Sequence, residues 1–152
     1  MKITIATEKK DIRASLKIAE DLKEWFTETA IENMKIDFVF NVNTLIVAKE
    51  KERVIGFLCY TKERYLLKIK WMGVARNCQR KGIGNELLRW LEKEAKKEKY
   101  KTIQVETLTD EEDYKPYELT RNFYYKRGFK KTGVKVIQEG CDTQIVLEKK
   151  IE

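Results

Sequence analysis

Residues 66–97 read LLKIKWMGVARNCQRKGIGNELLRWLEKEAKK and contain a change in hydrophobic period. From Leu66 to Val74 apolar residues alternate with lysines, which is typical of a β-strand. From Gly84 onward the apolar residues recur with the 3.6-residue period of a helix. Between the two lies QRKGIG at 79–84, a segment with two glycines and two basic residues. The stretch therefore predicts a strand, a glycine-rich turn and a helix.

The predicted turn has the features of an anion-binding site. The first N–H groups of a helix lack intrahelical partners and carry the positive end of the helix dipole. Gly82 and Gly84 allow a ligand to approach the backbone, and Arg80 and Lys81 add full positive charge. The expected ligand is a phosphate or pyrophosphate. Two common glycine patterns fail, because Leu87 occupies the third glycine position of G-x-G-x-x-G and G-x-x-x-x-G-K-[ST] does not occur.

The string WMGVARNCQRKGIGNELLRWLEKEA at 71–95 resembles the acetyl-CoA-binding motif of the GNAT superfamily of N-acetyltransferases. In that family a Q/R-x-x-G-x-G/A turn cradles the pyrophosphate of coenzyme A, and the preceding strand pairs with the pantetheine arm. Gly73 indicates a β-bulge or a close backbone approach in this strand. The resemblance implies acetyl-CoA as cosubstrate, bound by Met72, Gly73, Val74, Gln79, Arg80, Lys81, Gly82, Ile83, Gly84 and Asn85.

A second string, FYYKRGF at 123–129, resembles the family signature F-Y-x-x-x-G-F. In many members the tyrosine of that signature lies beside the coenzyme sulfur, and here it is Tyr124. With both signatures the resemblance covers nearly the whole chain. It implies an α/β (α+β) fold with a mixed, mostly antiparallel central sheet of about six to seven strands flanked by about four helices. Residues 1–152 are expected to form one N-acetyltransferase domain.

The hydrophobic patterns place the remaining elements. Strands are expected at 2–6, 44–48, 54–60, 66–74, 102–107, 129–137 and 143–147, and helices at about 7–29, 30–35, 84–99 and 117–127. The first helix is expected to bury Ile12, Leu16, Ala19, Leu22 and Phe26, and the third Ile83, Leu87, Leu88, Leu91 and Ala95. Four aromatic residues near the second helix are expected to pack in the core, with the alternative that they line an acceptor cleft: Trp25, Phe26, Phe38 and Phe40.

Acetyl transfer to an amine needs a base and an acid. An alkyl amine with a pKa of about 10.4 is neutral in roughly one molecule in two thousand at pH 7, so a base must remove its proton. Glu106 is the first candidate, and a surface glutamate is the alternative; the family's frequent acid on the central strand would fall near Lys70, which cannot act as an ordinary base. Tyr124 can protonate the leaving thiolate, since a tyrosine with a pKa of about 10 stays protonated at neutral pH.

Composition argues against nucleic-acid-binding, membrane, disulfide-rich and metal-binding proteins. The chain has 152 residues, 42% of them hydrophobic, and a formal charge of +7 that is scattered in mixed-sign runs, so no nucleic-acid partner is expected. No signal segment and no membrane span are visible, so a cytoplasmic protein without a membrane partner is expected. Because Cys59, Cys78 and Cys141 are far apart and histidine is absent, no disulfide framework and no metal site are expected.

The most specific interpretation is an acetyl-CoA-dependent N-acetyltransferase acting on a primary amine of a small molecule or peptide by direct attack. A catalytically weak acyl-CoA-binding or sensing module is the alternative, as Lys70 suggests, and a nucleic-acid-binding protein is the third. Asp110-Glu111-Glu112-Asp113 is either a solvated loop or an attractor for a cationic amine. Arg76 and Tyr117 depart from the proline and asparagine of many members. The acceptor, the acyl-chain preference and a homodimer are left open.

Overall fold

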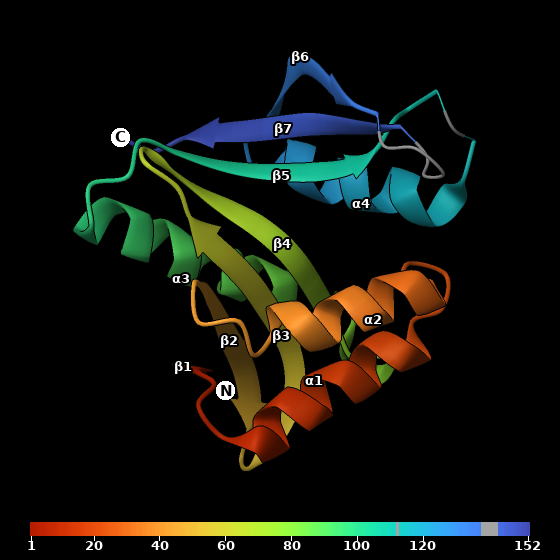
Figure 1. The fold of residues 1–152 in the computed structure, drawn as a ribbon, viewed down its shortest axis with the longest axis vertical. Coiled ribbons are helices and arrows are strands. Elements are labelled where there is room, and N and C mark those ends of the chain that lie inside the picture. The colour runs from red at the N-terminus through yellow and green to blue at the C-terminus, as the bar shows by residue number, and fades with distance from the viewer. Residues whose placement is uncertain (112, 138–142) are drawn as a thin grey trace.

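The computed structural model describes residues 1–111, 113–137 and 143–152, which form a sheet with helices on both faces (Figure 1). In chain order the elements are β1 (Lys2–Ile5), α1 (Lys9–Asp21), α2 (Glu28–Asp37), β2 (Asn43–Glu50), β3 (Arg53–Lys62), β4 (Leu66–Val74), the 3-10 turn η1 (Arg76–Cys78), α3 (Ile83–Lys97), β5 (Thr102–Leu108), α4 (Lys115–Lys126), β6 (Lys130–Val136) and β7 (Gln144–Lys150).

The seven described strands form one sheet in the order β1-β2-β3-β4-β5-β7-β6. Every neighbouring pair is antiparallel except β4 and β5, which run parallel and are joined by α3. A parallel pair needs such a crossover connection. The predicted fold class, a mixed and mostly antiparallel sheet flanked by helices, is confirmed.

The two central strands separate part-way along their length. The β4–β5 ladder begins at Leu66↔Thr102 and ends at Ile69↔Val105. Beyond that pair β4 continues along β3 as far as Val74, whereas β5 continues along β7 as far as Leu108. The divergence is visible at the centre of Figure 1. From residue 70 to residue 74 the edge of β4 that faces β5 therefore has no strand partner in the part of the chain that the structure describes.

Two hydrophobic clusters lie on opposite faces of the sheet. One joins α3 and α4 to the sheet, and the other joins α1 and α2 to β2 and β3. The face of α3 is buried as the 3.6-residue period predicts, because its five apolar positions all pack against the sheet. These residues are Ile83, Leu87, Leu88, Leu91 and Ala95.

The first helix differs from the prediction in its end and in its buried face. It ends at Asp21 rather than near Thr29, and the Thr27 hydroxyl caps a new helix by accepting from the N–H of Ala30 at 3.1 Å. Of the predicted apolar residues Ala19 and Leu22 are buried, whereas Ile12, Leu16 and Phe26 are half-buried and pack against the edge of the α1–α2 cluster. The buried face is Asp11, Ser15, Ile18 and Ala19.

Polar contacts explain this rotated face. Lys49 on β2 lies 2.9 Å from a carboxylate oxygen of Asp11, and the Ser15 hydroxyl donates to the Asp11 carbonyl at 2.9 Å. Buried polar groups are tolerated when they are paired in this way. A hydrophobic period cannot detect a partner that lies on another element.

The expected bulge in β4 lies three residues before Gly73. Trp71 pairs with Cys59 and Ile69 with Tyr60, so Lys70 is the extra residue and the bulge expected at Gly73 is wrong. This shift sends Trp71 to the α1–α2 cluster, although the alternation predicted the same side as Ile69. At Gly73 a side chain and not another backbone approaches closely, because a β-carbon there would lie 2.8 Å from the Phe57 ring.

Candidate active site

The turn between η1 and α3 exposes backbone donors. Arg80 and Gly82, on either side of Lys81, have φ angles of 63° and 84° in the left-handed region, and the backbone N–H groups of such turns can form an anion-binding concavity. Gly82 is the N-cap of α3, and no side chain among the described residues caps the helix there. A β-carbon at Gly82 would meet nothing within 4 Å. The first N–H groups of α3 can therefore bind an anion.

Side chains fix this turn and give it charge. The amide of Gln79 donates to the carbonyl of Val74 at 3.1 Å and so ties the turn to the end of β4. Arg80 and Lys81 are exposed, and neither forms an ion pair with a described residue. The glycine turn thus combines backbone N–H groups with two uncompensated positive charges.

The unpaired edge of β4 leads directly to this turn. The N–H of Ala75 donates to the Ile55 carbonyl on β3 at 2.8 Å. Because backbone groups alternate along a strand, the N–H of Gly73 also points toward β3, and those of Met72 and Val74 point toward the unpaired edge. An extended ligand could pair with Met72 and Val74 and end on the turn.

The end of α4 packs against the start of α3. A β-carbon at Gly84 would lie 3.1 Å from the ring of Phe123, so a larger residue there would push the ring back by a few tenths of an ångström. The guanidinium of Arg127 lies 3.8 Å from the centre of that ring and donates to the Asn85 amide oxygen at 3.0 Å. Burial lowers the pKa of Arg127. Phe123 and Arg127 were not singled out from the sequence, because only the tertiary structure brings α4 to the turn.

Tyr124 lies on the α3–α4 face of the sheet and is 3% exposed. Its ring packs against Phe123 and Phe129 with ring centres 5.3 and 5.1 Å away. Burial raises the pKa of its hydroxyl above the ordinary value. Gly128 caps the end of α4, because this residue has a φ of 93° and the N–H of Phe129 donates to the Tyr124 carbonyl at 3.1 Å.

Glu106 lies on the other face, one residue beyond the last β4–β5 pair. Lys68 Nζ lies 3.0 Å from Glu106 Oε1. Leu67 and Val105 belong to the α3–α4 cluster, so the alternating neighbours Lys68 and Glu106 face the α1–α2 side. The structure describes no contact between Glu106 and Tyr124, and their catalytic roles stay predictions.

A second carboxylate, which the sequence analysis did not single out, lies beside β4: that of Asp37. Asp37 at the end of α2 accepts from the Trp71 indole N–H at 2.7 Å, and Lys70 Nζ lies 3.7 Å from its other oxygen. The Asp37 side chain is 18% exposed. The sequence does not indicate this contact, since more than thirty residues separate Asp37 from Trp71.

The acidic cluster after β5 is engaged with β6. Asp110 pairs with Lys131, which lowers the pKa of the Asp110 carboxyl, and Glu111 lies 2.7 Å from Lys135. Glu112 lies outside the described residues. Neutralisation by two lysines weakens the hypothesis that this cluster attracts a cationic amine.

The four aromatic residues near α2 were expected to pack in the core, but they differ in burial. Phe38 is buried, whereas Phe40 is 54% exposed. The indole of Trp25 donates to the Pro116 carbonyl at 3.0 Å and to the Thr120 hydroxyl at 3.1 Å. The Tyr117 hydroxyl donates to the Trp25 carbonyl at 2.6 Å. The connection between α1 and α2 is therefore fastened to the start of α4.

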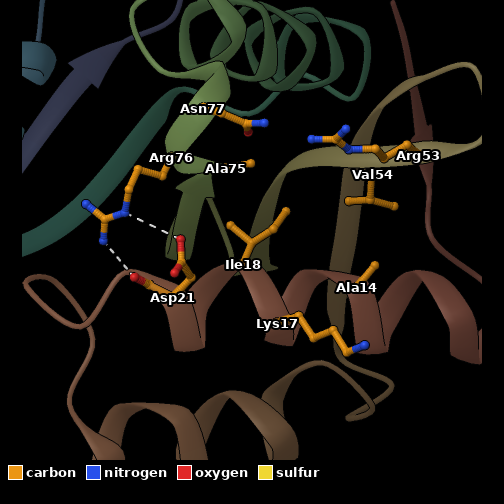
Figure 2. A pocket seen from close by; sticks show the side chains of 9 residues that line it. All are labelled: Ala14, Lys17, Ile18, Asp21, Arg53, Val54, Ala75, Arg76 and Asn77. Carbon is orange, nitrogen blue, oxygen red and sulfur yellow. Dashed lines mark hydrogen bonds and ion pairs between the residues drawn. The ribbon is translucent and has the colours of Figure 1, made fainter.

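Arg76, just after β4, also holds the connection between α1 and α2. Its guanidinium donates twice to the Glu24 carboxylate at 2.8 Å. It also donates to the Asp21 carbonyl at 2.7 Å, as Figure 2 shows. Beside it lies a cavity of about 540 Å³, and none of the predicted site residues lines it. Its walls are Ala14, Lys17, Ile18, Asp21, Arg53, Val54, Ala75, Arg76 and Asn77.

A cavity of about 460 Å³ adjoins the turn at Asn85, between α3 and the end of α4. Its charged lining is mostly basic, which suits phosphate groups. The charged residues are Arg89, Glu92, Lys126, Arg127 and Lys149. Among the described residues no group of histidine, cysteine, aspartate and glutamate could hold a metal ion. No described helix is both long and apolar enough to cross a membrane.

The profile of the acetyltransferase (GNAT) domain matches residues 41–131, more than half of the chain. The chain belongs to the GNAT family. The matched residues include β4, the glycine turn, α3 and α4, which are the elements that build the site described above. The predicted family resemblance is confirmed. A search of curated proteins found no match.

Solved GNAT structures share the fold over the full length of the chain. A GNAT-family protein from Desulfovibrio desulfuricans is 18% identical with a TM-score of 0.82, and 99% of each chain is covered. Aminoglycoside 6'-N-acetyltransferase from Enterococcus faecium is 18% identical with a TM-score of 0.76, covering 100% of this chain and 98% of its own. PaiA N-acetyltransferase from Thermoplasma acidophilum, solved with coenzyme A, is 19% identical with a TM-score of 0.73 and 99% coverage of both chains. At these identities the likeness concerns the fold.

Proposed function

We propose that the protein transfers the acetyl group of acetyl-CoA to a primary amine of a small molecule or peptide. The observation that carries the proposal is the unpaired edge of β4, which ends on a glycine turn that no described side chain caps. An extended chain with a pyrophosphate fits that combination of hydrogen-bonding edge and anion site. Similar folds solved with coenzyme A support the assignment.

The unpaired edge of β4 and the glycine turn bind different parts of the coenzyme. Met72 and Val74 offer backbone groups to the pantetheine arm. Residues 79–85 surround the pyrophosphate with N–H groups and with the charges of Arg80 and Lys81. Gly73 lies between Met72 and Val74, and its lack of a β-carbon leaves room for the Phe57 ring. The basic cavity beside Asn85 suits the remaining phosphate of the coenzyme.

The chemistry requires two proton transfers, and we assign them to residues on opposite faces of the sheet. When bound, acetyl-CoA supplies the thioester carbon that an amine attacks. Glu106, on the α1–α2 face, accepts a proton from the amine. Tyr124, on the α3–α4 face, keeps its proton over the whole physiological range because burial raises its pKa, and it donates to the departing sulfur. Both substrates are therefore bound together, in a ternary complex.

Calorimetric titration with coenzyme A and a thiol-release assay with a panel of amines test the proposal. Tyr124→Phe should lower kcat by roughly a hundredfold or more and leave the coenzyme Kd unchanged. Tyr125→Phe is the matched control, since the adjacent hydroxyl is buried and no described atom bonds to it. Equal loss in both variants would contradict the role of Tyr124. Absence of coenzyme binding would refute the whole proposal.

The alternative function is an acyl-CoA-binding module with weak or no turnover. It is favoured by the lysine partners of both nearby carboxylates, since Glu106 pairs with Lys68 and Asp37 with Lys70. Coenzyme binding without acetylation of any amine would select it. Glu106→Gln should lower kcat if the carboxylate is the base and should change nothing in a binding module. One domain over residues 1–152, a cytoplasmic location and a homodimer remain proposals from the sequence.

A further inference from the structure

Resting on the proposed acetyl transfer, we infer that the amine acceptor also carries an anionic group, a carboxylate or a phosphate, and that Lys68 and Lys70 bind that group. Both lysines lie on β4 at the point where β5 separates from it. Their contacts with Glu106 and with Asp37 put both ammonium groups on the α1–α2 face, opposite Tyr124. The acceptor must approach from this face if the coenzyme lies against α3 and α4.

Each carboxylate at this point has a lysine partner. Lys68 Nζ lies 3.0 Å from Glu106, and Lys70 Nζ lies 3.7 Å from Asp37. Glu148, the next acid along the face, accepts from Gln104 at 3.1 Å and lies opposite Lys130 in the β6–β7 ladder. A polycation entering here would meet as many positive charges as negative ones.

An acceptor with both charges can replace these ion pairs without stranding a group. Its ammonium takes the place of Lys68 beside Glu106, and its anion binds the ammonium that Glu106 releases. Lys70 can turn to the same anion from its longer 3.7 Å contact with Asp37, which keeps the hydrogen bond from the Trp71 indole. A purely cationic acceptor would displace Lys68 from Glu106 and leave it beside a second positive charge without a counter-charge of its own. The side chains of Lys68, Lys70 and Glu106 are 31%, 34% and 30% exposed, so solvent and a small ligand can reach them.

Matched acceptors test the inference. The rate of thiol release from acetyl-CoA is measured with β-alanine against β-alaninamide and with phosphoethanolamine against ethanolamine, and with spermidine and kanamycin as polycations. Calorimetry measures binding of the same acceptors to the protein loaded with coenzyme A. We expect each anionic acceptor to exceed its neutral analogue in kcat/KM and in affinity by roughly tenfold, the effect of one charge-assisted hydrogen bond.

Variants assign the preference to the two lysines. Lys68→Met and Lys70→Met should each lower the ratio of kcat/KM for the anionic acceptor to kcat/KM for its neutral analogue by roughly tenfold, mainly through the KM of the anionic acceptor. Lys68→Arg should retain the preference. Lys93→Met removes the same charge from an exposed position on α3 and should change neither acceptor.

The outcomes separate this inference from the proposed function. Acetylation with equal use of anionic and neutral acceptors, or with preference for spermidine or kanamycin, would overturn the inference and leave the acetyltransferase proposal standing. An equal effect of the lysine variants on both members of a pair would also overturn it. Coenzyme binding without acetylation of any acceptor would refute the proposed function and the acceptor class together.

Discussion

Gly73→Ala tests the close approach between β4 and β3. The added β-carbon would lie 2.8 Å from Cε1 and 2.9 Å from Cζ of Phe57, whereas ordinary carbon contacts lie at about 3.5–4.0 Å. The Phe57 ring would have to retreat by about 1 Å. That ring has no exposed surface and packs against Phe38 and Phe26 with ring centres 5.5 and 6.5 Å away. We therefore expect the variant to lose about 1–3 kcal/mol of unfolding free energy through overpacking.

Urea and thermal unfolding followed by circular dichroism measure this loss. For a domain of this length, 2 kcal/mol corresponds to a fall in Tm of about 4–8 °C. Phe57→Leu removes the ring atoms that the new methyl group would meet. The double variant should consequently lose less free energy than the sum of the two single variants. Additive losses, or a Gly73→Ala protein as stable as the parent, would refute the reasoning from the contact distance.

Backbone conformation, a surface carboxylate and a buried thiol give three further predictions. Gly82→Ala should lose about 1–2 kcal/mol in urea unfolding because its φ of 84° strains an L-residue, and Gly82→Asn should lose less. A hydrogen bond from Arg76 holds the pKa of Glu24 at about 2 instead of 4.5, so the folded state binds fewer protons than the unfolded state between these two values. The resulting stabilisation is present above the unfolded pKa and disappears as the pH falls toward 2. Glu24→Gln should therefore flatten the dependence of unfolding free energy on pH between about 2 and 4.5. Burial raises the pKa of the Cys59 thiol to about 12, so peptide mass spectrometry should find iodoacetamide on half-buried Cys78 well before Cys59 at pH 8.

The sequence was most informative where neighbours along the chain decide the structure. The bounds of β4 agree with the predicted strand, and all five apolar residues predicted for α3 are buried. Both follow from a hydrophobic period that each element satisfies against one sheet face. The glycine turn could be predicted because Gly82 and the start of α3 are adjacent in the chain.

Prediction failed where a distant residue changes the local pattern. The buried face of α1 turned because Asp11 meets Lys49 of β2. The alternation along β4 changed at Lys70 because β3 opposes it with one residue fewer. Neither partner is visible in the period of the element itself, so a burial pattern read from one segment could not include it.

The candidate site shows the same division. Both signature segments and the candidates Glu106 and Tyr124 could be named from the sequence, but the faces that they occupy could not. Asp37 was missed because α2 reaches β4 only through the packing of the α1–α2 layer. Phe123 likewise meets Gly84 only because α4 crosses to the start of α3.

By itself the sequence determined the family, the order of the elements and the glycine turn before α3, because hydrophobic periods and glycine positions act over a few residues. Only the tertiary structure decided where β4 and β5 separate, which backbone groups that separation leaves unpaired, and which lysine accompanies each carboxylate. Those features depend on contacts between segments more than thirty residues apart. Their energies arise from burial and charge pairing in space, which no local pattern records.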